Sequence, residues 1–544
     1  MKELLKRLIC SILFLCIVFV IFFTLKVGQD NKNIKEANLV VFGDNIDAEY
    51  KPFVEEDGIY IAVDTIKKLI DENIYYDKVA TKIIVTTYDK VLKFKIDENK
   101  MSTNFEYSDI KNEAKLLNNA PYIDINLLKD LYNINVEYND DTSTISIDRK
   151  ETSDIEVKYN NVKVYSDINT KSQVLETLNK GSKVTAYTES LKHNRWYKIK
   201  TDSGVIGYIS KNNIDIPNIE NNNSNEESNE SGSNEKITMF WQYGSNLNTL
   251  GNKIEGVDVV SPTWYELKNS NGDINSEYSK SYYQKAKANG YEIWPIITNG
   301  IDSTNYSPED TSKMLNSEYS REKFIKNLVE ILKEDKVEGI NMDFESMKTE
   351  DKDLYTQLIR EMAPILRKEN IKLSVDMYFV AYIDRKRVGQ ASDYVILMGY
   401  DQRGSWSSEA GSIAEATWVE KNIESLLNDS KIPPEKIILG VPFYTRLWTE
   451  KAGTEKPTTT VYTMKDCQEF INDNNLTPVW DQDAGQNYAE YSRGDYTYKL
   501  WIEDKDSIKR RVETVNKYNL AGITGWRKGL ETSDIWQVIY ENLK

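Results

Sequence analysis

The sequence predicts an α/β protein whose C-terminal part forms a (β/α)8 TIM barrel, and three observations lead to that prediction. Eight short apolar runs from residue 237 onward alternate with stretches of helical periodicity. Ten of the eleven tryptophans fall between Trp241 and Trp536, so this half has a composition of its own. Polar residues at the ends of several runs favour a barrel over the open doubly wound sheet that periodicity alone leaves possible.

The apolar runs are expected to be parallel barrel strands in a domain spanning residues 237–544. Residues 321–334 and 353–368, which lie between runs, carry apolar side chains at three- and four-residue spacing and are expected to be helices. The eight runs begin at residues 237, 257, 292, 339, 372, 394, 437 and 522 and read ITMFW, VDVVSP, EIWPIIT, GINMDFE, KLSVDM, YVILMGY, IILGV and GITGW.

Two smaller regions precede the barrel. Residues 218–236 consist almost wholly of Asn, Ser and Glu, a composition with little to bury, and are expected to be a flexible linker. Residues 155–215 contain the short runs VKVYSD, GSKVTAYTES, RWYKIKT and GVIGYIS, whose spacing predicts a small β-barrel. Its aromatic residues either form the core or line a binding groove; these are Trp196, Tyr197 and Tyr208.

Residues 44–149 contain a repeat. YIAVDTIKKL at residue 60 recurs as YIDINLLKDL at residue 122, and the same offset relates TKIIV at residue 81 to STISI at residue 143. The pattern predicts a duplicated strand, helix and strand unit that forms a small α+β stalk domain. A structural spacer is the simplest interpretation of it.

Residues 1–30 are predicted to be a membrane anchor. Leu8–Leu25 carries no charge and follows Lys2, Lys6 and Arg7, a pattern typical of a spanning helix with a positive cytoplasmic flank. A cleaved signal peptide, with a shorter apolar core, and a lipid-modified Cys16 are the alternatives. The expected location is the cell membrane, with a single-pass anchor and the later domains outside the cytoplasm.

Charge and residue counts exclude several classes of site. A net charge of -17 without a basic stripe argues against nucleic acid as a partner. His193 is the one histidine, which excludes a His-based triad and a multi-histidine zinc site. Cys10, Cys16 and Cys467 are too few and too scattered for a disulfide framework or a thiolate cluster, and no metal or cofactor is expected.

The run GINMDFES, residues 339–346, breaks the rule that parallel strands are apolar on both faces. In a strand, Ile340, Met342 and Phe344 share one face. The polar residues of the other face lie at the carboxyl end of the strand, where TIM-barrel active sites are found. These residues are Asn341, Asp343 and Glu345, with Glu345 outermost. Ion pairing that holds loops together is the structural alternative.

Two carboxylates at this spacing interact strongly. At a separation of about 5 Å and an effective dielectric near 20, their repulsion is roughly 3 kcal/mol, or about two pK units. We therefore expect one of Asp343 and Glu345 to keep its proton near neutral pH while the other ionises. A proton held in this way is what an acid needs to protonate a glycosidic oxygen.

The run GINMDFES is one of four motifs that share an order along the chain. The others are MGYD at residues 398–401, GVPFYTRLW at 440–448 and AGITGW, which ends at Trp526. Together they resemble glycoside hydrolase family 18, the chitinase-like barrels, whose fourth strand carries DxxDxDxE. That signature reads Glu338, Asn341, Asp343 and Glu345 here: the last two positions match, and the first two depart conservatively.

The resemblance implies a mechanism and a set of residues. In this family the 2-acetamido group of the substrate acts as the nucleophile, which gives substrate-assisted retention of configuration. Asn341 retains hydrogen-bonding groups that could orient Asp343. By the resemblance, the catalytic residues are Glu345, Asp343 and Tyr400, and the substrate-binding residues are Asn341, Met398, Asp401, Tyr444 and Trp526.

The flanking regions refine the expected substrate. Residues 44–149 resemble the N-terminal domain of copper amine oxidases, without the histidines that copper would need, and residues 155–215 resemble bacterial SH3-like domains, which bind wall peptides or glycans. The whole is similar to family 18 enzymes of spore cortex and cell wall. That branch implies cleavage of β-1,4 bonds after N-acetylglucosamine in peptidoglycan. A chitinase acting on chitin oligomers and a silent, lectin-like wall-binding protein are the alternatives.

Overall fold

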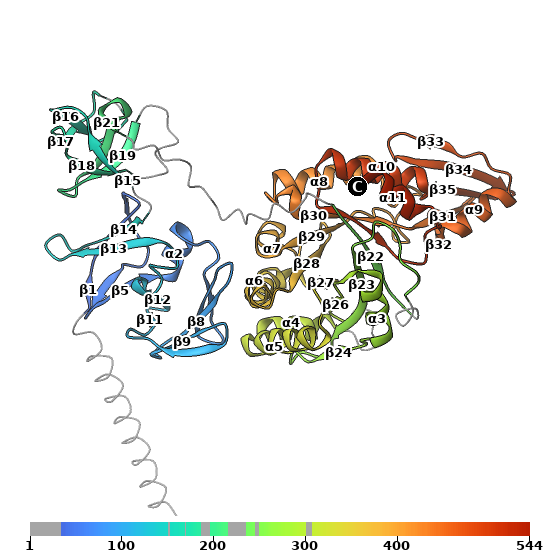
Figure 1. The fold of residues 1–544 in the computed structure, drawn as a ribbon, viewed down its shortest axis with the longest axis horizontal. Helices are drawn as coiled ribbons and strands as arrows, with labels where there is room; N and C mark the ends of the chain where they lie inside the picture. The colour runs from blue at the N-terminus through green and yellow to red at the C-terminus, as the bar shows by residue number, and fades with distance from the viewer. Residues whose placement is uncertain are drawn as a thin grey trace, which may run out of the picture. The chain divides into compact units, whose positions relative to one another are not determined.

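The computed structural model describes residues 34–150, 153–168, 170–186, 196–215, 236–244, 250–300 and 307–543. The predicted anchor, and the predicted linker up to residue 235, lie outside these ranges. Among the described residues, no helix has both the length and the apolar character needed to cross a membrane. The chain divides into two compact units, residues 1–85 with 92–230 and residues 86–91 with 231–544, and each is considered by itself (Figure 1).

Eight parallel strands of the second unit close into a barrel, because β22 pairs with both β23 and β36. Every one of them begins in a predicted apolar run, so the predicted barrel is confirmed. The strands, in order around the barrel, are β22 (Ile237–Gln242), β23 (Val259–Leu267), β26 (Ile296–Thr298), β27 (Gly339–Asp343), β28 (Lys372–Met377), β29 (Tyr394–Met398), β30 (Ile437–Pro442) and β36 (Gly522–Trp526). Two short strands, β24 (Ile274–Ser276) and β25 (Glu292–Ile293), pair with β23.

Helices surround the barrel strands (Figure 1). The two predicted helices are confirmed as α5 and α6, and α6 continues through Pro364. Short 3-10 turns precede α6 and β30 at Thr349–Asp351 and Pro434–Lys436. The helices are α3 (Lys280–Asn289), α4 (Pro308–Asn316), α5 (Glu318–Asp335), α6 (Lys352–Lys368), α7 (Arg385–Ala391), α8 (Ala416–Asn428), α10 (Lys505–Lys517) and α11 (Ile535–Leu543).

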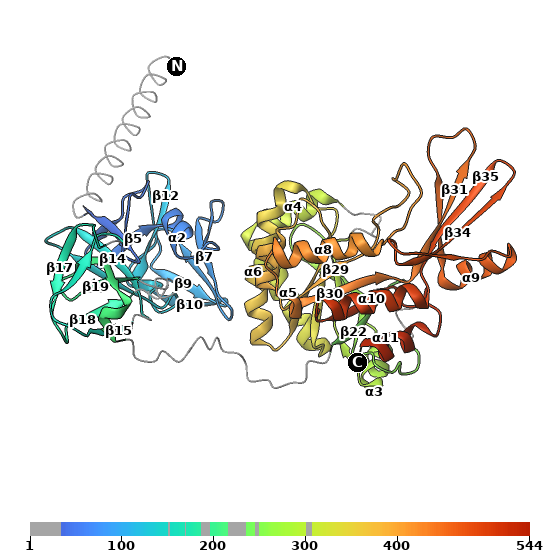
Figure 2. The same ribbon diagram turned by 90° about the horizontal axis from the view of Figure 1, so that it is seen from above.

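A second, antiparallel sheet is inserted between β30 and α10 and projects from the barrel (Figure 2). Helix α9 (Met464–Asp473) packs on one face of this sheet, with Cys467, Ile471 and Leu500 in the shared core. The sequence analysis assigned this stretch to the barrel domain without identifying the insertion. Its strands are β31 (Tyr444–Lys451), β32 (Thr458–Thr463), β33 (Val479–Asp481), β34 (Gln486–Arg493) and β35 (Tyr496–Ile502).

The repeat in the first unit appears as strands that recur 62 residues apart. The two copies meet in the pairing of β5 with β12, where Ile61 lies opposite Ile123, its own counterpart. The first copy comprises β2 (Asn38–Val41), β3 (Asp44–Ile46), β4 (Phe53–Glu55), β5 (Gly58–Ala62), β6 (Tyr75–Asp77) and β7 (Lys82–Thr86). The second comprises β9 (Lys100–Thr103), β10 (Glu106–Asp109), β11 (Lys115–Leu117), β12 (Ala120–Asp124), β13 (Ile134–Asn139) and β14 (Thr144–Arg149). Strands β1 (Lys35–Glu36) and β8 (Val91–Lys95) have no such counterpart in the domain.

The copies exchange strands. The sheet β13-β14-β2-β3 and the sheet β10-β9-β8-β7-β6 each contain a hairpin from one copy beside a hairpin from the other. The sheet β1-β4-β5-β12-β11 also draws on both. Every sheet of the domain therefore depends on both halves of the repeat.

The helix predicted for each copy forms only in the first. Helix α2 spans Val63–Leu69, whereas its counterpart is a 3-10 turn, Ile125–Leu127. Ala62 precedes the helix, but Asp124 stands at the equivalent place, and its carboxylate accepts hydrogen bonds from the backbone N–H groups of Asn126 and Ile59. The second copy has a 3-10 turn where a helix was predicted, so the prediction for that copy was wrong.

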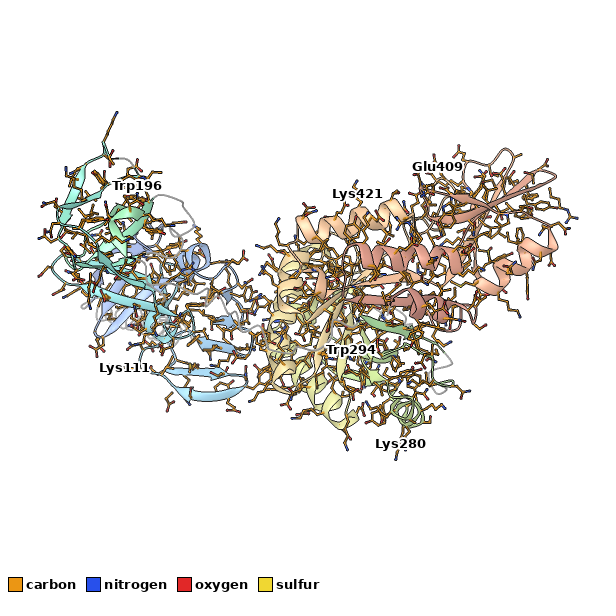
Figure 3. The ribbon with its side chains drawn as sticks, turned by 45° about the horizontal axis from the view of Figure 1, so that its top comes forward. Lys111, Trp196, Lys280, Trp294, Glu409 and Lys421 are labelled. Carbon is orange, nitrogen blue, oxygen red and sulfur yellow. The ribbon has the colours of Figure 1, made fainter. Side chains whose placement is uncertain are left out.

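The predicted small β-barrel is a seven-stranded sheet with the core residues Ile155, Val164 and Ile199. Tyr197 is buried in that core, while Trp196 (Figure 3) and Tyr208 lie half-buried on the opposite face. Tyr165 pairs with Tyr208 and contacts Trp196 edge-on at 5.6 Å. The strands are β15 (Ser153–Val157), β16 (Val162–Tyr165), β17 (Val174–Leu178), β18 (Lys183–Ala186), β19 (Trp196–Thr201), β20 (Ile206–Ser210) and β21 (Ile214–Asp215), and a 3-10 turn, Lys211–Asn213, precedes β21.

Candidate active site

Strand β27 starts with a glycine because a tryptophan ring covers its α-carbon. A Cβ atom on Gly339 would lie 2.6 Å from the ring of Trp294, which is labelled in Figure 3. The apolar face of the strand packs on the helices, and Phe344 contacts Phe324 of α5 and Tyr355 of α6 at ring distances of 5.9 and 6.0 Å. The polar face of β27 is left for the interior of the barrel.

Glu338, the first signature position, takes no part in the mouth of the barrel. It precedes β27, where its carboxylate accepts a hydrogen bond from Lys287 at 2.5 Å and another from the backbone N–H of Ile293 at 2.9 Å. It therefore joins elements at the amino end of the strands. Chemistry at the carboxyl end of β27 does not reach it.

Asn341 is fully buried, and both ends of its amide are occupied. Its oxygen accepts a hydrogen bond from the indole N–H of Trp241 at 2.7 Å, and its NH2 group donates to Asp376 at 2.7 Å. From the sequence, Asn341 is predicted to orient Asp343 and to bind substrate. Its side-chain hydrogen bonds go to Trp241 and Asp376 instead, and the residue has no exposed surface.

Glu345 lies two residues beyond the end of β27 and is half-buried. Asn299 fixes its backbone on both sides: the amide oxygen of Asn299 accepts from the Glu345 N–H at 3.2 Å, and the amide NH2 donates to the Glu345 carbonyl at 2.7 Å. Ser346 has a positive φ of 52° and donates its N–H to the hydroxyl of Tyr382 at 3.2 Å. These contacts hold Glu345 at the mouth, beyond the 9% exposed Asp343.

Aromatic rings line the interior beside these carboxylates. Tyr400 contacts Trp241, Tyr378 and Tyr444 edge-on, at ring distances of 6.3, 6.2 and 6.4 Å. Burial raises the pKa of Tyr400 well above its usual value, so its hydroxyl remains a hydrogen-bond donor. The half-buried ring of Trp526 lies 5.7 Å from that of Trp241. The aromatic residues predicted at the ends of β29 and β36 are thus joined through Trp241.

Asp401 is held in a second cluster at the same end of the barrel. It has a positive φ of 55°, accepts a hydrogen bond from the hydroxyl of Tyr444 at 2.6 Å, and lies 3.6 Å from the guanidinium of Arg446. Met398 is 5% exposed and shares the face of β29 with Tyr400 by strand alternation. Asp401 and Tyr444 thus come together in space as well as in the predicted set.

Sequence reasoning missed several residues of the site: Trp241, Asn299, Asp376 and Tyr378. One of them carried a signal. Asp376 falls in the run KLSVDM, where a strand that is buried on both faces should have no carboxylate. The same rule had identified Asp343 in β27. The aromatic residues gave no such signal, because a buried ring in an apolar strand is ordinary core.

Models of three known families match the chain. The model of glycosyl hydrolases family 18 matches residues 205–530, that of the copper amine oxidase N-terminal domain residues 40–147, and that of the bacterial SH3 domain residues 160–215. The chain is 24% identical to the uncharacterized glycosylase YvbX of Bacillus subtilis over 286 residues, which cover 50% of this chain and 81% of YvbX. It is also 24% identical over 259 residues to a cortical fragment-lytic enzyme of B. subtilis, covering 45% of this chain and 58% of that enzyme.

Solved structures share the barrel fold. The spore cortex-lytic enzyme SleL of Bacillus megaterium has a TM-score of 0.50 and 21% identity, with 57% of this chain and 74% of that one covered. A chitinase of Chromobacterium violaceum also has a TM-score of 0.50, with 19% identity and coverage of 57% and 99%. The family model spans more than half of the 544 residues, including all eight barrel strands. The chain belongs to glycosyl hydrolases family 18.

Proposed function

We propose that this glycoside hydrolase cleaves β-1,4 bonds after N-acetylglucosamine in peptidoglycan, with retention of configuration and with the substrate's acetamido group as nucleophile. The observation that supports it most is the position of Glu345. This carboxylate is half-buried at the carboxyl end of β27, with its backbone clamped by Asn299 and with Asp343 two residues behind it. An acid at a fixed place beside a second carboxylate is what substrate-assisted cleavage requires.

Each predicted residue has a role in this proposal. Glu345 protonates the leaving glycosidic oxygen and then accepts a proton from the attacking water. Asp343 orients the acetamide N–H and stabilises the positive charge that develops on the oxazolinium-like intermediate. Tyr400 donates its hydroxyl to the acetamide oxygen, consistent with the raised pKa that keeps it protonated.

The remaining predicted residues, apart from Asn341, bind sugar in this proposal. Trp526 offers the face of its half-buried ring to the sugar at the cleavage site. Tyr444 and Asp401 form one hydrogen-bonded pair at the mouth and present polar groups to hydroxyls of the substrate. Met398 supplies an apolar wall beside Tyr400. Asn341 does not contact the sugar, since it is fully buried, and instead positions Trp241 through their hydrogen bond.

Peptidoglycan is the proposed polymer because of the relatives and the accessory domain. A cortical fragment-lytic enzyme and a spore cortex-lytic enzyme are among the proteins that this chain resembles. The bacterial SH3 domain is consistent with binding to the cell wall. We propose that the half-buried aromatic face formed by Tyr165, Trp196 and Tyr208 contacts wall glycan or peptide.

We also propose that the N-terminal segment anchors the protein in the cell membrane, with the catalytic barrel on the wall side. The support is the uncharged run Leu8–Leu25 and its basic flank. Fractionation of cells that express the full chain tests this. The proposal expects the protein in the membrane fraction and digestible by protease added to protoplasts, and a chain found in the cytosol would contradict it.

The catalytic proposal is tested with the full chain acting on purified peptidoglycan, with a reducing-end label and mass spectrometry of the fragments. Wild type is expected to create new N-acetylglucosamine reducing ends. Glu345→Gln should lower the rate by about 10²- to 10⁴-fold, the usual contribution of general acid catalysis. Glu338→Gln is the matched control, because it makes the same change at the opposite end of the same strand and should keep most of the activity.

Two other outcomes would replace the proposal. Release of products from chitin oligomers but not from peptidoglycan would assign the protein as a chitinase, a reading also open because a chitinase is among the structural relatives. Sedimentation with the wall without hydrolysis of either polymer would assign it as a silent, lectin-like binding protein. The presence of Glu345, Asp343 and Tyr400 in one barrel mouth favours the enzyme.

A further inference from the structure

A buried carboxyl group lies beside the signature strand. Asp376 of β28 is 4% exposed, and the parallel register of β27 and β28 pairs Asn341 with Ser374 and Met342 with Val375. Continued by one residue, that register sets Asp376 level with Asp343. Strand alternation turns Asp376 to the barrel interior, as it does Asn341.

Asp376 ends a chain of hydrogen bonds that crosses three strands. An indole N–H can only donate, so Trp241 fixes the amide oxygen of Asn341 toward β22 and the NH2 group toward β28. The NH2 group then donates to Asp376, and both hydrogen bonds measure 2.7 Å. The amide of Asn341 cannot turn without breaking one of them.

The surroundings of Asp376 disfavour a negative charge. Among the residues that the structure describes, no lysine or arginine forms an ion pair with it. Burial and the negative charge of Glu345 raise its pKa well above the usual value, and the hydrogen bond from Asn341 opposes this only in part. The charges of Asp376 and Asp343 also raise the pKa values of Tyr355, from α6, and Tyr400, after β29.

The family signature has an aspartate at the position that Asn341 occupies here. An amide stands at that position in this chain, and a carboxyl group lies one strand away at the other end of a 2.7 Å hydrogen bond. We propose that Asp376 is a positioning residue that supplies, from β28, the second carboxyl group of the signature. This inference rests on the proposed glycosidase reaction at the same site.

The action of Asp376 is indirect, because it works through its hydrogen bond to the fully buried Asn341. Negative charge on Glu345 raises the pKa of Asp376 further, so Asp376 holds its proton more firmly when Glu345 has given up its own. Asn341 and Trp241 therefore keep one arrangement through both steps. Trp241 in turn packs on Tyr400 and Trp526, so the aromatic part of the site depends on this chain.

The proposal is tested in the full chain with two variants: one removes the carboxyl group of Asp376, and the other exchanges the amide at position 341 with the carboxyl group at position 376. Asp376→Ala removes the acceptor and should lower kcat on peptidoglycan by about 100-fold, with KM changed by less than about 3-fold. In the double variant Asn341→Asp with Asp376→Asn, a carboxylate at position 341 accepts from Trp241 and from the new amide. That variant should recover kcat to within about 5-fold of wild type.

Two results would overturn the proposal: an Asp376→Ala kcat within about 3-fold of wild type, or a double variant no faster than Asp376→Ala. A merely structural residue would lose activity in both variants and would not be rescued by the exchange. Correct folding of each variant is checked by its thermal unfolding transition.

A second measurement needs no substrate and separates this inference from the proposed function. A raised pKa in the folded state means that Asp376 makes wild type lose stability as pH rises above about 4, a contribution that Asp376→Asn lacks. The melting temperature of Asp376→Asn minus that of wild type should therefore increase between about pH 4 and pH 8. A constant difference overturns the inference, even where wild type hydrolyses neither polymer and the proposed function itself has failed.

Discussion

Buried acids are treated differently in the helical layer of the barrel and in its interior. Glu361 of α6 is 1% exposed and accepts hydrogen bonds from the fully buried guanidinium of Arg321 at 3.2 and 3.3 Å. Glu503, before α10, lies 3.8 Å from the buried Arg511. Asp376 in the interior is equally buried but is bonded to a neutral amide. Glu361 and Glu503 in the helical layer thus have a cation beside them, whereas the hydrogen-bond partner of Asp376 in the interior is neutral.

The largest expected effect comes from removal of a cation in the helical layer. Arg321→Met leaves the carboxylate of Glu361 buried without its charge partner, which should cost about 3–5 kcal/mol of unfolding free energy. Denaturant unfolding of the full chain, followed at the barrel transition, measures it. Addition of Glu361→Gln to that variant should restore part of the loss. If Arg321→Met alone is as stable as wild type, the proposed difference between buried acids in the helical layer and in the barrel interior is wrong.

Glu503 shows how far an arginine at 3.8 Å, Arg511, offsets the rise in pKa that burial causes. Burial raises the pKa of Glu503 from its usual value of 4.5 to about 7, although Arg511, Ser507 and Gln486 all favour the ionised form. The folded protein therefore binds more protons than the unfolded chain between these pH values, and stability falls as pH rises.

Glu503→Gln removes this pH dependence. The stability of wild type relative to the variant should decline by about 3 kcal/mol from pH 4.5 to pH 7 and then level off. Urea unfolding at a series of pH values measures the decline. A difference that grows with pH would mean that Arg511 holds Glu503 ionised, which would sharpen the contrast with Asp376 instead.

Asp401 lies between the two cases, since it has both a tyrosine hydroxyl at 2.6 Å and an arginine at 3.6 Å. Tyr444→Phe deletes the hydroxyl that donates to this carboxylate, a hydrogen bond to a charged group worth about 1.5–3 kcal/mol. We expect kcat/KM on peptidoglycan to fall by about 10-fold or more. Tyr319→Phe, at a side chain that is 73% exposed, is the control and should leave kcat/KM unchanged.

The smallest effect is expected at the surface. Lys465 and Glu469 of α9 are 3.5 Å apart, with exposed side-chain fractions of 79% and 59%. Lys465→Ala should change the unfolding free energy by less than about 0.5 kcal/mol, because solvent screens such pairs. A melting curve in low and high salt checks this. A loss comparable to that of Arg321→Met would show that burial is not what separates the two classes of ion pair.

The barrel could be predicted from sequence because each of its strands is a short, dense apolar run. GINMDFE and KLSVDM both became strands, and the carboxylates of GINMDFE stood out against their neighbours. The same signal was present in KLSVDM and was passed over, since a single charge does not form a pattern. The partnership of Asp376 with Asn341 depends on the parallel register of two strands 35 residues apart, which no local pattern encodes.

Two other features, the inserted sheet and the turn in the second copy of the repeat, could not be predicted from local sequence patterns. The strands of the inserted sheet mix polar and apolar residues, as QNYAEYSR in β34 and YTYKLWI in β35 do, so they lack the apolar density that identified the barrel strands. In the repeat, similarity between YIAVDTIKKL and YIDINLLKDL concealed the change from Ala62 to Asp124. A helix follows Ala62, whereas a 3-10 turn follows Asp124.

The exchange of hairpins in the repeated domain makes its two copies depend on each other as the subunits of a dimer do. With Ile61 opposite Ile123, the two copies are related as the subunits of an isologous dimer would be, now fused into one chain. Each copy completes sheets that its twin begins, so neither half has a closed core of its own. A single copy expressed alone should dimerise with a second copy of itself. If the chain is cut between the two copies, the two fragments should stay associated until denaturant separates them.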